Sequence, residues 1–315
     1  MPAITRLLLT PLVVVAIVIF ATACGEGDDG DSSSSSASGA SSSSSSSHSG
    51  GTLYIGGIPD QDLAILEDRF NILATYLSEK TGLTFKYLPS VSYAAVVTAF
   101  RNGDIHLAWY GGLTGVQARL AVDGAVAIVQ RETDAAFHSV FVAAPDSGIA
   151  DLEDLRGRSF SFGSESSTSG NLMPRFYLSE AGINPDEDLS AVIYSGSHDV
   201  TWKLVEAGTV SAGVLNASVW KRRVEAGEVD ETRVTVFYMT PGFYDYHWVA
   251  RPDLDEQFGA GITRAITDAM LAIDPANGGI EQAIHELFEE SRFIETKNSN
   301  YDGIAEVARG LGLVE

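Results

Sequence analysis

Hydrophobic and polar positions alternate with two different periodicities along the chain after residue 51. Short apolar runs rich in β-branched and aromatic residues predict strands, and apolar residues at helical spacing predict helices. In the first half, helices are expected to begin near residues 63, 93 and 113, between strands at 53–56, 83–88, 105–109 and 125–130. Repeated β-α units with short loops are typical of a mostly parallel sheet covered by helices on both faces.

A second set of such units lies between two longer extended runs, at 137–144 and 234–239. Strands are predicted at 158–163, before Tyr194 and at 211–215, with helices after residue 171 and at 198–207 and 217–226. From residue 254 onward the apolar spacing is mostly helical. Two extended crossings predict two α/β lobes: residues 52–140 plus 237–315 form lobe I, and residues 141–236 form lobe II. Hinged lobes of this kind close around a ligand.

The first 51 residues have a different pattern. In residues 1–23, Arg6 precedes an apolar run that ends in small residues, which is typical of a secretory signal and too short for a spanning helix of roughly 20 residues. Cys24, the only cysteine, stands where a motif resembling a bacterial lipobox places the lipidated residue. The alternative is an ordinary signal with an incidental cysteine. Residues 24–51, rich in Gly, Asp and Ser, predict a flexible tether. We therefore expect an extracytoplasmic protein anchored to the cell membrane by lipid alone.

Composition narrows the class of partner. The formal net charge is −22, from 42 acidic and 20 basic residues, which excludes a general binder of nucleic acid or of acidic membranes. A single cysteine excludes an internal disulfide, and no two of the six histidines have the spacing of zinc ligands on a helix. Because the net charge is strongly negative, the electrostatic field of the whole molecule repels anions. Any anion that this protein binds must be held by local groups.

A segment rich in hydroxyl groups lies between the predicted strand 158–163 and the next helix. It reads Ser164-Glu165-Ser166-Ser167-Thr168-Ser169-Gly170-Asn171, and Pro174 places the helix start between Ser167 and Asn171. Free N–H groups, the positive end of the helix dipole and three hydroxyls would converge there. This pattern predicts a site that binds an anion without a positively charged side chain. The alternative is a well-capped helix with no ligand.

Five further loops place aromatic and polar side chains at the ends of predicted strands or helices. They contain Ser92-Tyr93, Trp109-Tyr110-Gly111-Gly112, Tyr194 to Asp199, Asn216, and Phe243-Tyr244-Asp245-Tyr246-His247-Trp248. Hydroxyl, imidazole and amide donors are what an oxyanion needs where lysine and arginine are absent. Ligands of open α/β sheets bind at the carboxyl ends of strands. Any one of these aromatic residues could instead be a core residue with a polar end, but together they favour a binding site.

The segment 163–174 resembles the Ser-Thr-Ser-Gly-x-x-x-Pro motif of the phosphonate- and phosphite-binding proteins of ABC importers. Supporting matches at 92–97, 104–111 and 197–199 follow in order across roughly residues 53–251. The patterns Ser-Glu-Ser-Ser-Thr-Ser-Gly and Tyr-His-Trp resemble a subgroup labelled selenate-binding. The resemblance implies a type II periplasmic-binding-protein fold, with a mostly parallel sheet in each of two lobes and a double-strand hinge.

The same resemblance implies a set of ligand-binding residues. Ser167, Thr168 and Ser169 would hold the oxyanion, Tyr93 and Tyr110 would contact it from the first lobe, and His198 from the second. Their positions in loops add three more expected contacts: Asn216, Tyr244 and Asp245. Family members that take aminoalkyl phosphonates bind the amine with carboxylates. With Asp245 as the one good candidate here, an amine-bearing ligand is not favoured.

Asp245 also predicts which oxyanion fits. A buried carboxylate beside an anion is unfavourable unless a proton lies between them. Hydrogen phosphite, an alkylphosphonate monoanion or hydrogen selenite can supply that proton, whereas selenate and sulfate cannot. We therefore expect the site to reject the fully ionised anions.

Three functions remain open at this point: a solute-binding protein that delivers a small oxyanion to an ABC permease and its ATPase, a sensory receptor of the same fold, and a hydrolase using Ser167, His198 and Asp199 or Asp245. The hydrolase is disfavoured, because the segment lacks a Gly-x-Ser-x-Gly elbow and the chain has no phosphate-binding lysine motif. We expect the first function, in a monomer without metal, cofactor or enzymatic activity. The candidate ligands are phosphite, phosphonate, phosphate, selenite and selenate.

Overall fold

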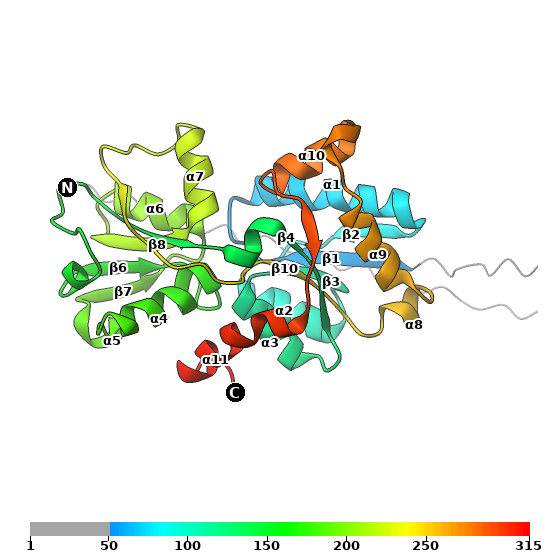
Figure 1. The fold of residues 1–315 in the computed structure, drawn as a ribbon, viewed down its shortest axis with the longest axis horizontal. Coiled ribbons are helices and arrows are strands. Elements are labelled where there is room, and N and C mark those ends of the chain that lie inside the picture. The colour runs from blue at the N-terminus through cyan, green and yellow to red at the C-terminus, as the bar shows by residue number, and fades with distance from the viewer. Residues whose placement is uncertain (1–50) are drawn as a thin grey trace, which may run out of the picture. The chain divides into compact units, whose positions relative to one another are not determined.

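The computed structural model describes residues 51–315. The predicted signal, Cys24 and all of the predicted tether before residue 51 lie outside the described residues. Within 51–315, no helix has both the length and the apolar character needed to cross a bilayer. The described part contains two sheets, each with helices packed on it (Figure 1).

The sheet of lobe I has six strands in the order β11-β4-β10-β3-β1-β2. Their bounds are β1 (Thr52–Gly57), β2 (Thr84–Tyr87), β3 (Leu107–Tyr110), β4 (Val126–Arg131), β10 (His247–Ala250) and β11 (Phe293–Glu295). The helices of this lobe are α1 (Leu63–Thr81), α2 (Tyr93–Asn102), α3 (Gly112–Ala121), α8 (Leu254–Phe258), α9 (Ile262–Leu271), α10 (Gly279–Leu287) and α11 (Asp302–Gly310). Helix α1 packs against α9 and α10, while α2 and α11 pack against α3, and Figure 1 shows these two groups on opposite faces of the sheet.

The sheet of lobe II has five strands in the order β7-β6-β8-β5-β9. They are β5 (Ser139–Ala143), β6 (Ser159–Phe162), β7 (Ala191–Tyr194), β8 (Ala212–Asn216) and β9 (Thr235–Met239), and the helices are α4 (Met173–Glu180), α5 (Pro185–Asp188), α6 (His198–Glu206) and α7 (Ala217–Glu225). Two separate apolar clusters, one containing Phe141 and Phe160 and the other Val140 and Trp202, pack within this lobe. Neighbouring residues of β5 thus belong to different clusters, because a strand points its side chains alternately to opposite faces.

Both sheets are mixed, but most strands of each sheet run in one direction, as the sequence predicts. In lobe I, β10 runs antiparallel to both β3 and β4, and β11 runs antiparallel to β4. In lobe II, β5 runs antiparallel to β8 and β9. The physical reason is that β10 and β5 are the first strands after each crossing between lobes. The chain enters each sheet there from the opposite end, so β10 and β5 run against their neighbours, and β11 at the edge of the lobe I sheet runs in the direction of β10.

Two crossing segments join the lobes side by side. The Phe137 N–H donates to the Phe243 carbonyl at 2.8 Å, and the Phe243 N–H donates back at 2.9 Å. The Thr240 N–H likewise donates to the Ser139 carbonyl at 3.0 Å. The extended runs expected at 137–144 and 234–239 lie mainly in β5 and β9 of lobe II. We therefore propose lobe boundaries at the paired crossings, near residues 138 and 240, just outside the two strands.

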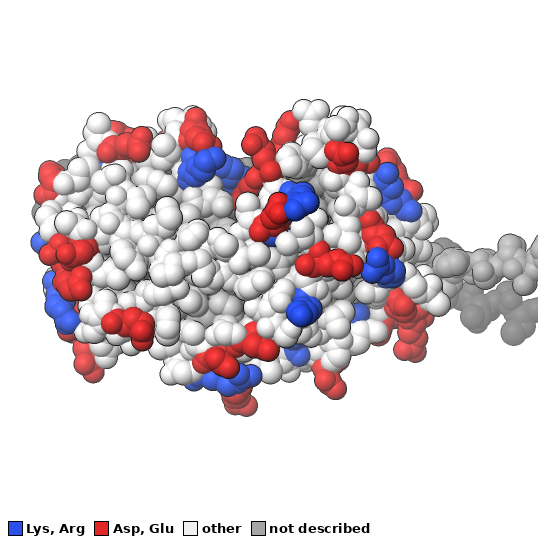
Figure 2. Space-filling view, viewed as in Figure 1, with Lys and Arg blue, Asp and Glu red and all other residues white. Residues whose placement is uncertain are grey.

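Helix caps place the candidate residues at their loops. Ser92, Ser197 and Asn216 cap α2, α6 and α7, and each side-chain oxygen accepts an N–H from the first turn. These helices therefore start directly after Ser92, Ser197 and Asn216. The acidic composition is visible on the surface: Figure 2 shows Asp and Glu side chains along the edges of the face drawn and across its right-hand half, whereas the middle of the left-hand half is largely uncharged.

Candidate functional site

The hydroxyl-rich segment forms the N-terminal end of a helix, as the capping pattern predicts. Ser167 precedes one turn of π-helix (Thr168–Leu172) that continues into α4, and its Oγ accepts the Gly170 N–H at 2.9 Å. The Gly163 N–H donates to the Gly170 carbonyl at 2.7 Å and closes the loop. A Cβ atom at Gly170 would lie 2.9 Å from Ser167 Oγ and 3.1 Å from Gly163 Cα, so this close approach requires glycine. The first N–H groups of such a helix have no partner within the helix.

This loop of lobe II docks on the start of α3 in lobe I. The Leu113 N–H donates to Thr168 Oγ1 at 2.9 Å, and the Thr114 hydroxyl donates to the Ser166 carbonyl at 2.9 Å. Ser167, Thr168 and Ser169 are all buried by these contacts. The two lobes therefore meet at the segment for which the sequence predicts an anion site.

Asp245 lies beside the same hydroxyls. Its Oδ1 accepts the Gly112 N–H at 2.9 Å, and its Oδ2 is buried without a hydrogen-bond partner among the described residues. A Cβ atom at Gly111 would lie 3.0 Å from both Asp245 Oδ1 and Thr168 Oγ1, so the two oxygens come together over this glycine. Burial raises the pKa of Asp245 to about 7, even though the Gly112 N–H and the Thr168 and Ser169 hydroxyls favour its charged form.

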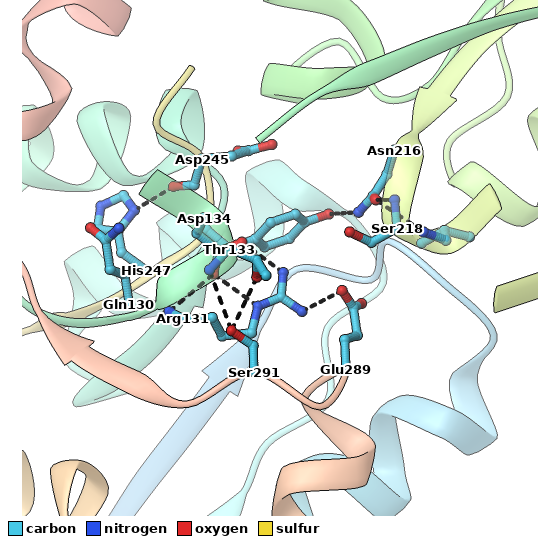
Figure 3. Close-up of polar contacts among 12 residues, drawn as sticks. Gln130, Arg131, Thr133, Asp134, Asn216, Ser218, Asp245, His247, Glu289 and Ser291 are labelled. Atoms are coloured by element: carbon cyan, nitrogen blue, oxygen red, sulfur yellow. Dashed lines mark hydrogen bonds and ion pairs between the residues drawn. The ribbon is translucent and has the colours of Figure 1, made fainter. Parts of the chain in front are cut away.

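His247 holds the backbone of Asp245 in place (Figure 3). Its ring accepts a hydrogen bond from Arg119 at Nε2, 2.8 Å away, so its proton lies on Nδ1 and is donated to the Asp245 carbonyl at 3.0 Å. Burial and the nearby Arg119 charge lower the pKa of His247 well below its ordinary value, which keeps the ring neutral. The ring also stacks on Tyr301 with 3.7 Å between centroids.

His198 and Asn216 belong to a second hydrogen-bond network, centred on Tyr246. His198 Nδ1 accepts the Asn216 N–H at 3.3 Å, which leaves the proton of the neutral ring on Nε2, 3.4 Å from Tyr246 Oη. The Asn216 side-chain amide donates to the same oxygen at 3.2 Å, and Tyr246 in turn donates to Asp60 at 2.7 Å. Burial lowers the pKa of His198, so the ring can donate to an anion as a neutral group.

The two tyrosines expected from lobe I have different environments. Tyr93 is buried, its hydroxyl has no hydrogen-bond partner among the described residues, and Ser167 lies beside it. The Tyr110 hydroxyl instead donates to the Val96 carbonyl at 3.2 Å, and its ring packs edge-on against Phe100. Tyr110 therefore fits a core residue better than a ligand contact. Tyr244 is half-buried and packs edge-on against Tyr301.

Two further residues join the site that the sequence-based assignment omitted, Asp60 and Tyr246. Asp60 follows β1 in the loop before α1, at the carboxyl end of a parallel strand. Because ligands bind at such strand ends, this position is the feature of the sequence that indicates a role for Asp60 in the site. Tyr246 lay within the aromatic loop but had no distinguishing feature among three neighbouring aromatic residues. Only the fold shows that its hydroxyl connects Asp60 with Asn216 and His198.

Arg131, which lies behind this network, is already paired with two carboxylates. Arg131 lies over the rings of Trp109 and Tyr246, 5.3 and 5.2 Å from their centroids. It pairs with Asp134 at 2.7 Å and with Glu289 at 2.6 Å, as Figure 3 shows. An anion at the site would therefore be held by N–H groups, hydroxyls and imidazole, with the helix dipole in support.

The hydrolytic arrangement considered from the sequence is not assembled. Asp199 pairs with Arg223 at 2.7 Å, whereas His198 Nδ1 accepts a backbone N–H. Ser167 Oγ accepts the Gly170 N–H as a helix cap. Neither carboxylate orients the histidine toward a serine, as a hydrolytic triad requires.

Comparisons with known proteins identify the family. The family model of the periplasmic substrate-binding protein of phosphonate ABC transporters matches residues 55–301. A curated relative from Prochlorococcus marinus (strain MIT 9301), named "Probable ABC transporter phosphite binding protein PhnD1", is 38% identical over 83% of this chain and 90% of its own.

Solved structures give the same result. PhnD1 from Prochlorococcus marinus (MIT 9301) in complex with methylphosphonate superposes with a TM-score of 0.79, at 38% identity over 84% of this chain and 99% of that one. A binding protein of an ABC phosphonate transporter from Pseudomonas aeruginosa, with a TM-score of 0.72 at 19% identity over 81% of this chain and 85% of that one, shares the fold. They confirm the two-lobed type II periplasmic-binding-protein fold. The chain belongs to the extracytoplasmic phosphonate-binding proteins of ABC transporters, and it is a solute-binding protein and not an enzyme.

Proposed function

We propose that this protein captures a small oxyanion that still carries an acidic proton, of the phosphite or methylphosphonate class, between its two lobes. Ser167, Thr168 and Ser169 hold the anion, with Tyr93 and His198 as further donors and Asp245 as the group that reads the proton. The observation that carries the proposal is the unpartnered, buried Asp245 Oδ2 beside the Thr168 and Ser169 hydroxyls. The named ligands of the 38% identical relative, phosphite and methylphosphonate, support it.

The chemistry of Asp245 separates the candidate ligands. A monoanion with one O–H group can bond to a carboxylate without placing two negative charges in direct contact. Selenate and sulfate have no proton at neutral pH, so a charged Asp245 repels them. Although the sequence resembles a subgroup labelled selenate-binding, this proposal predicts that selenate is not the preferred ligand.

The test of the site is a triple substitution of Ser167, Thr168 and Ser169 by alanine. A hydrogen bond to a charged group contributes roughly 1.5–3 kcal/mol, so the loss of even one lowers affinity more than about tenfold. Calorimetric titration with methylphosphonate should show at least that loss in a variant whose circular dichroism spectrum is native. Ser179→Ala, an exposed serine of α4, is the control and should bind as wild type does. Affinity of the triple variant within a few-fold of wild type would reject the site.

We also propose that the protein is a monomer tethered by a lipid on Cys24, from which it delivers its ligand to the permease and ATPase of an importer. A Cys24→Ser variant should move from the membrane to the soluble fraction, because a single lipidated terminus is the only anchor the proposal provides. Membrane association that persists after a carbonate wash would contradict this anchor.

A further inference from the structure

Asp60 is a buried carboxylate in the loop between β1 and α1. It is 1% exposed, and its Oδ2 accepts the Tyr246 hydroxyl at 2.7 Å. The Gln61 side-chain amide lies 3.5 Å from the same oxygen. The other oxygen, Oδ1, has no hydrogen-bond partner among the described residues. A buried carboxylate oxygen without a donor is costly, so its partner is expected to come from outside the chain.

Asp60 is linked by hydrogen bonds to several proposed ligand-binding residues. Its backbone carbonyl accepts the backbone N–H of His198 at 3.0 Å, which joins the loop to α6 of lobe II. The Tyr246 oxygen to which it bonds also receives the Asn216 amide. Burial raises the pKa of Tyr93 well above its ordinary value, and the charge of Asp60 raises it further, so the two groups are close enough to interact electrostatically. The Tyr93 hydroxyl, like Asp60 Oδ1, is buried without a hydrogen-bond partner among the described residues.

We propose that Asp60 is a second ligand-facing carboxylate, so that the oxyanion is held between Asp60 and Asp245 with a proton in each contact. Either the ligand O–H donates to the carboxylate, or the carboxyl O–H donates to a ligand oxygen. The inference rests on the proposed oxyanion function and deepens it. The site then selects oxyanions that bind together with protons, such as hydrogen phosphite, alkylphosphonate monoanions and dihydrogen phosphate.

The groups around Asp60 do not remove the need for those protons. Tyr87 on β2, Tyr93 on α2, His198 on α6 and Tyr246 before β10 lie close enough to feel its charge, and none of them brings a positive charge when the imidazole is neutral. Arg69 on α1 feels the charge of Asp60, but it forms its ion pair with Glu289 at 3.9 Å. An anion that enters beside Asp60 therefore still needs a proton between the two charges.

The test counts the protons that bind with the ligand. Methylphosphonate is titrated at pH 8.5, where it enters as a dianion, in buffers with different ionisation enthalpies. Wild type should take up more than one proton per ligand, because each carboxylate that faces the dianion requires one. Asp60→Asn and Asp245→Asn should each lower the count by about one. Asp62→Asn, an exposed residue two positions along the chain, is the matched control and should leave the count unchanged.

The outcomes separate this inference from the proposed function. If wild type binds methylphosphonate with one proton or fewer, or if a folded Asp60→Asn variant takes up as many protons as wild type, Asp60 does not face the ligand. The proposed function survives either result. If wild type binds neither methylphosphonate nor phosphite, the proposed function itself fails. The wild-type count decides the question even if Asp60→Asn does not fold.

Discussion

At Asp245, burial raises the pKa of the carboxyl to about 7, from about 3.9 in an unfolded chain. A carboxyl with a raised folded pKa stabilises the fold most at low pH, and that contribution is lost as pH rises through the folded pKa. The ligand-free protein therefore bears a cost at neutral and alkaline pH for keeping this group buried. The same cost is what makes Asp245 sensitive to a ligand proton.

Asp245→Asn should remove this cost. We expect the free energy of unfolding of the ligand-free variant to fall less than that of wild type between pH 5 and pH 8, by about 3 kcal/mol at most. Denaturant unfolding at several pH values measures the difference. Burial also raises the pKa of Asp134, to about 6, but Asp134 is present in both proteins and its effect cancels. Parallel pH profiles would show that the folded pKa of Asp245 is not raised.

Individual residues differ in how far the sequence predicts them. Ser167 and Thr168 follow from the capping pattern, because a helix N-terminus is a local feature that needs no knowledge of the fold. Tyr110 was predicted from resemblance, and the structure shows its hydroxyl bonded to the Val96 carbonyl. The sequence places Asp60 in a loop at the end of a strand, but its proximity to His198 depends on how the two lobes meet.

Among the elements, those with clear caps or periodicity were predicted within a few residues, and β10 was missed. The run His247–Ala250 is short, fully buried and preceded by aromatic residues, so it reads as part of a loop. Its place between β3 and β4 depends on contacts with residues far away in sequence. Strand β10 nevertheless matters for the site, because the ring of His247, its first residue, forms a hydrogen bond with the backbone carbonyl of Asp245.

Gly115 of α3 tests this packing between elements. A Cβ atom there would clash with the His247 ring, whereas one at Gly303 of α11 would meet open space. We expect Gly115→Ala to lower the free energy of unfolding by about 1–3 kcal/mol through overpacking, and to weaken methylphosphonate binding by moving Asp245. Gly303→Ala should instead stabilise the protein by up to about 1 kcal/mol, because alanine favours the helix. Chemical denaturation of both variants compares them. A Gly115→Ala variant as stable as Gly303→Ala would show that His247 does not fill this space.

At the scale of the whole molecule, polar contacts join the two lobes beside the site. Arg222 on α7 of lobe II donates to Gln61 at 2.7 Å and pairs with Glu289 of lobe I at 2.9 Å. Burial alone would raise the pKa of Glu289, but the charges of Arg131, Arg222 and Arg69 lower it to about 2, so Glu289 stays charged. Gln61 is the direct neighbour of Asp60, which links this contact to the proposed ligand site.

Arg222→Ala should favour the open arrangement of the lobes and so weaken ligand binding. A partly exposed ion pair contributes up to about 1 kcal/mol, which corresponds to a roughly fivefold loss of affinity for methylphosphonate. Lys221→Ala is the control, because Lys221 pairs with Glu225 within the same helix. Titration calorimetry measures both variants. Equal affinities would mean that the Arg222 contacts do not contribute to closure.

The most direct test of the central claim is the affinity of the wild-type protein for methylphosphonate, phosphite and selenate, measured by calorimetry from pH 5.5 to pH 8.5. The account predicts tighter binding of phosphite and methylphosphonate than of selenate. It also predicts that their affinity falls as pH rises through the last ionisation of each ligand, because Asp245 and the ligand then lose the proton between them. Tighter binding of selenate, with no such dependence on pH, would contradict it.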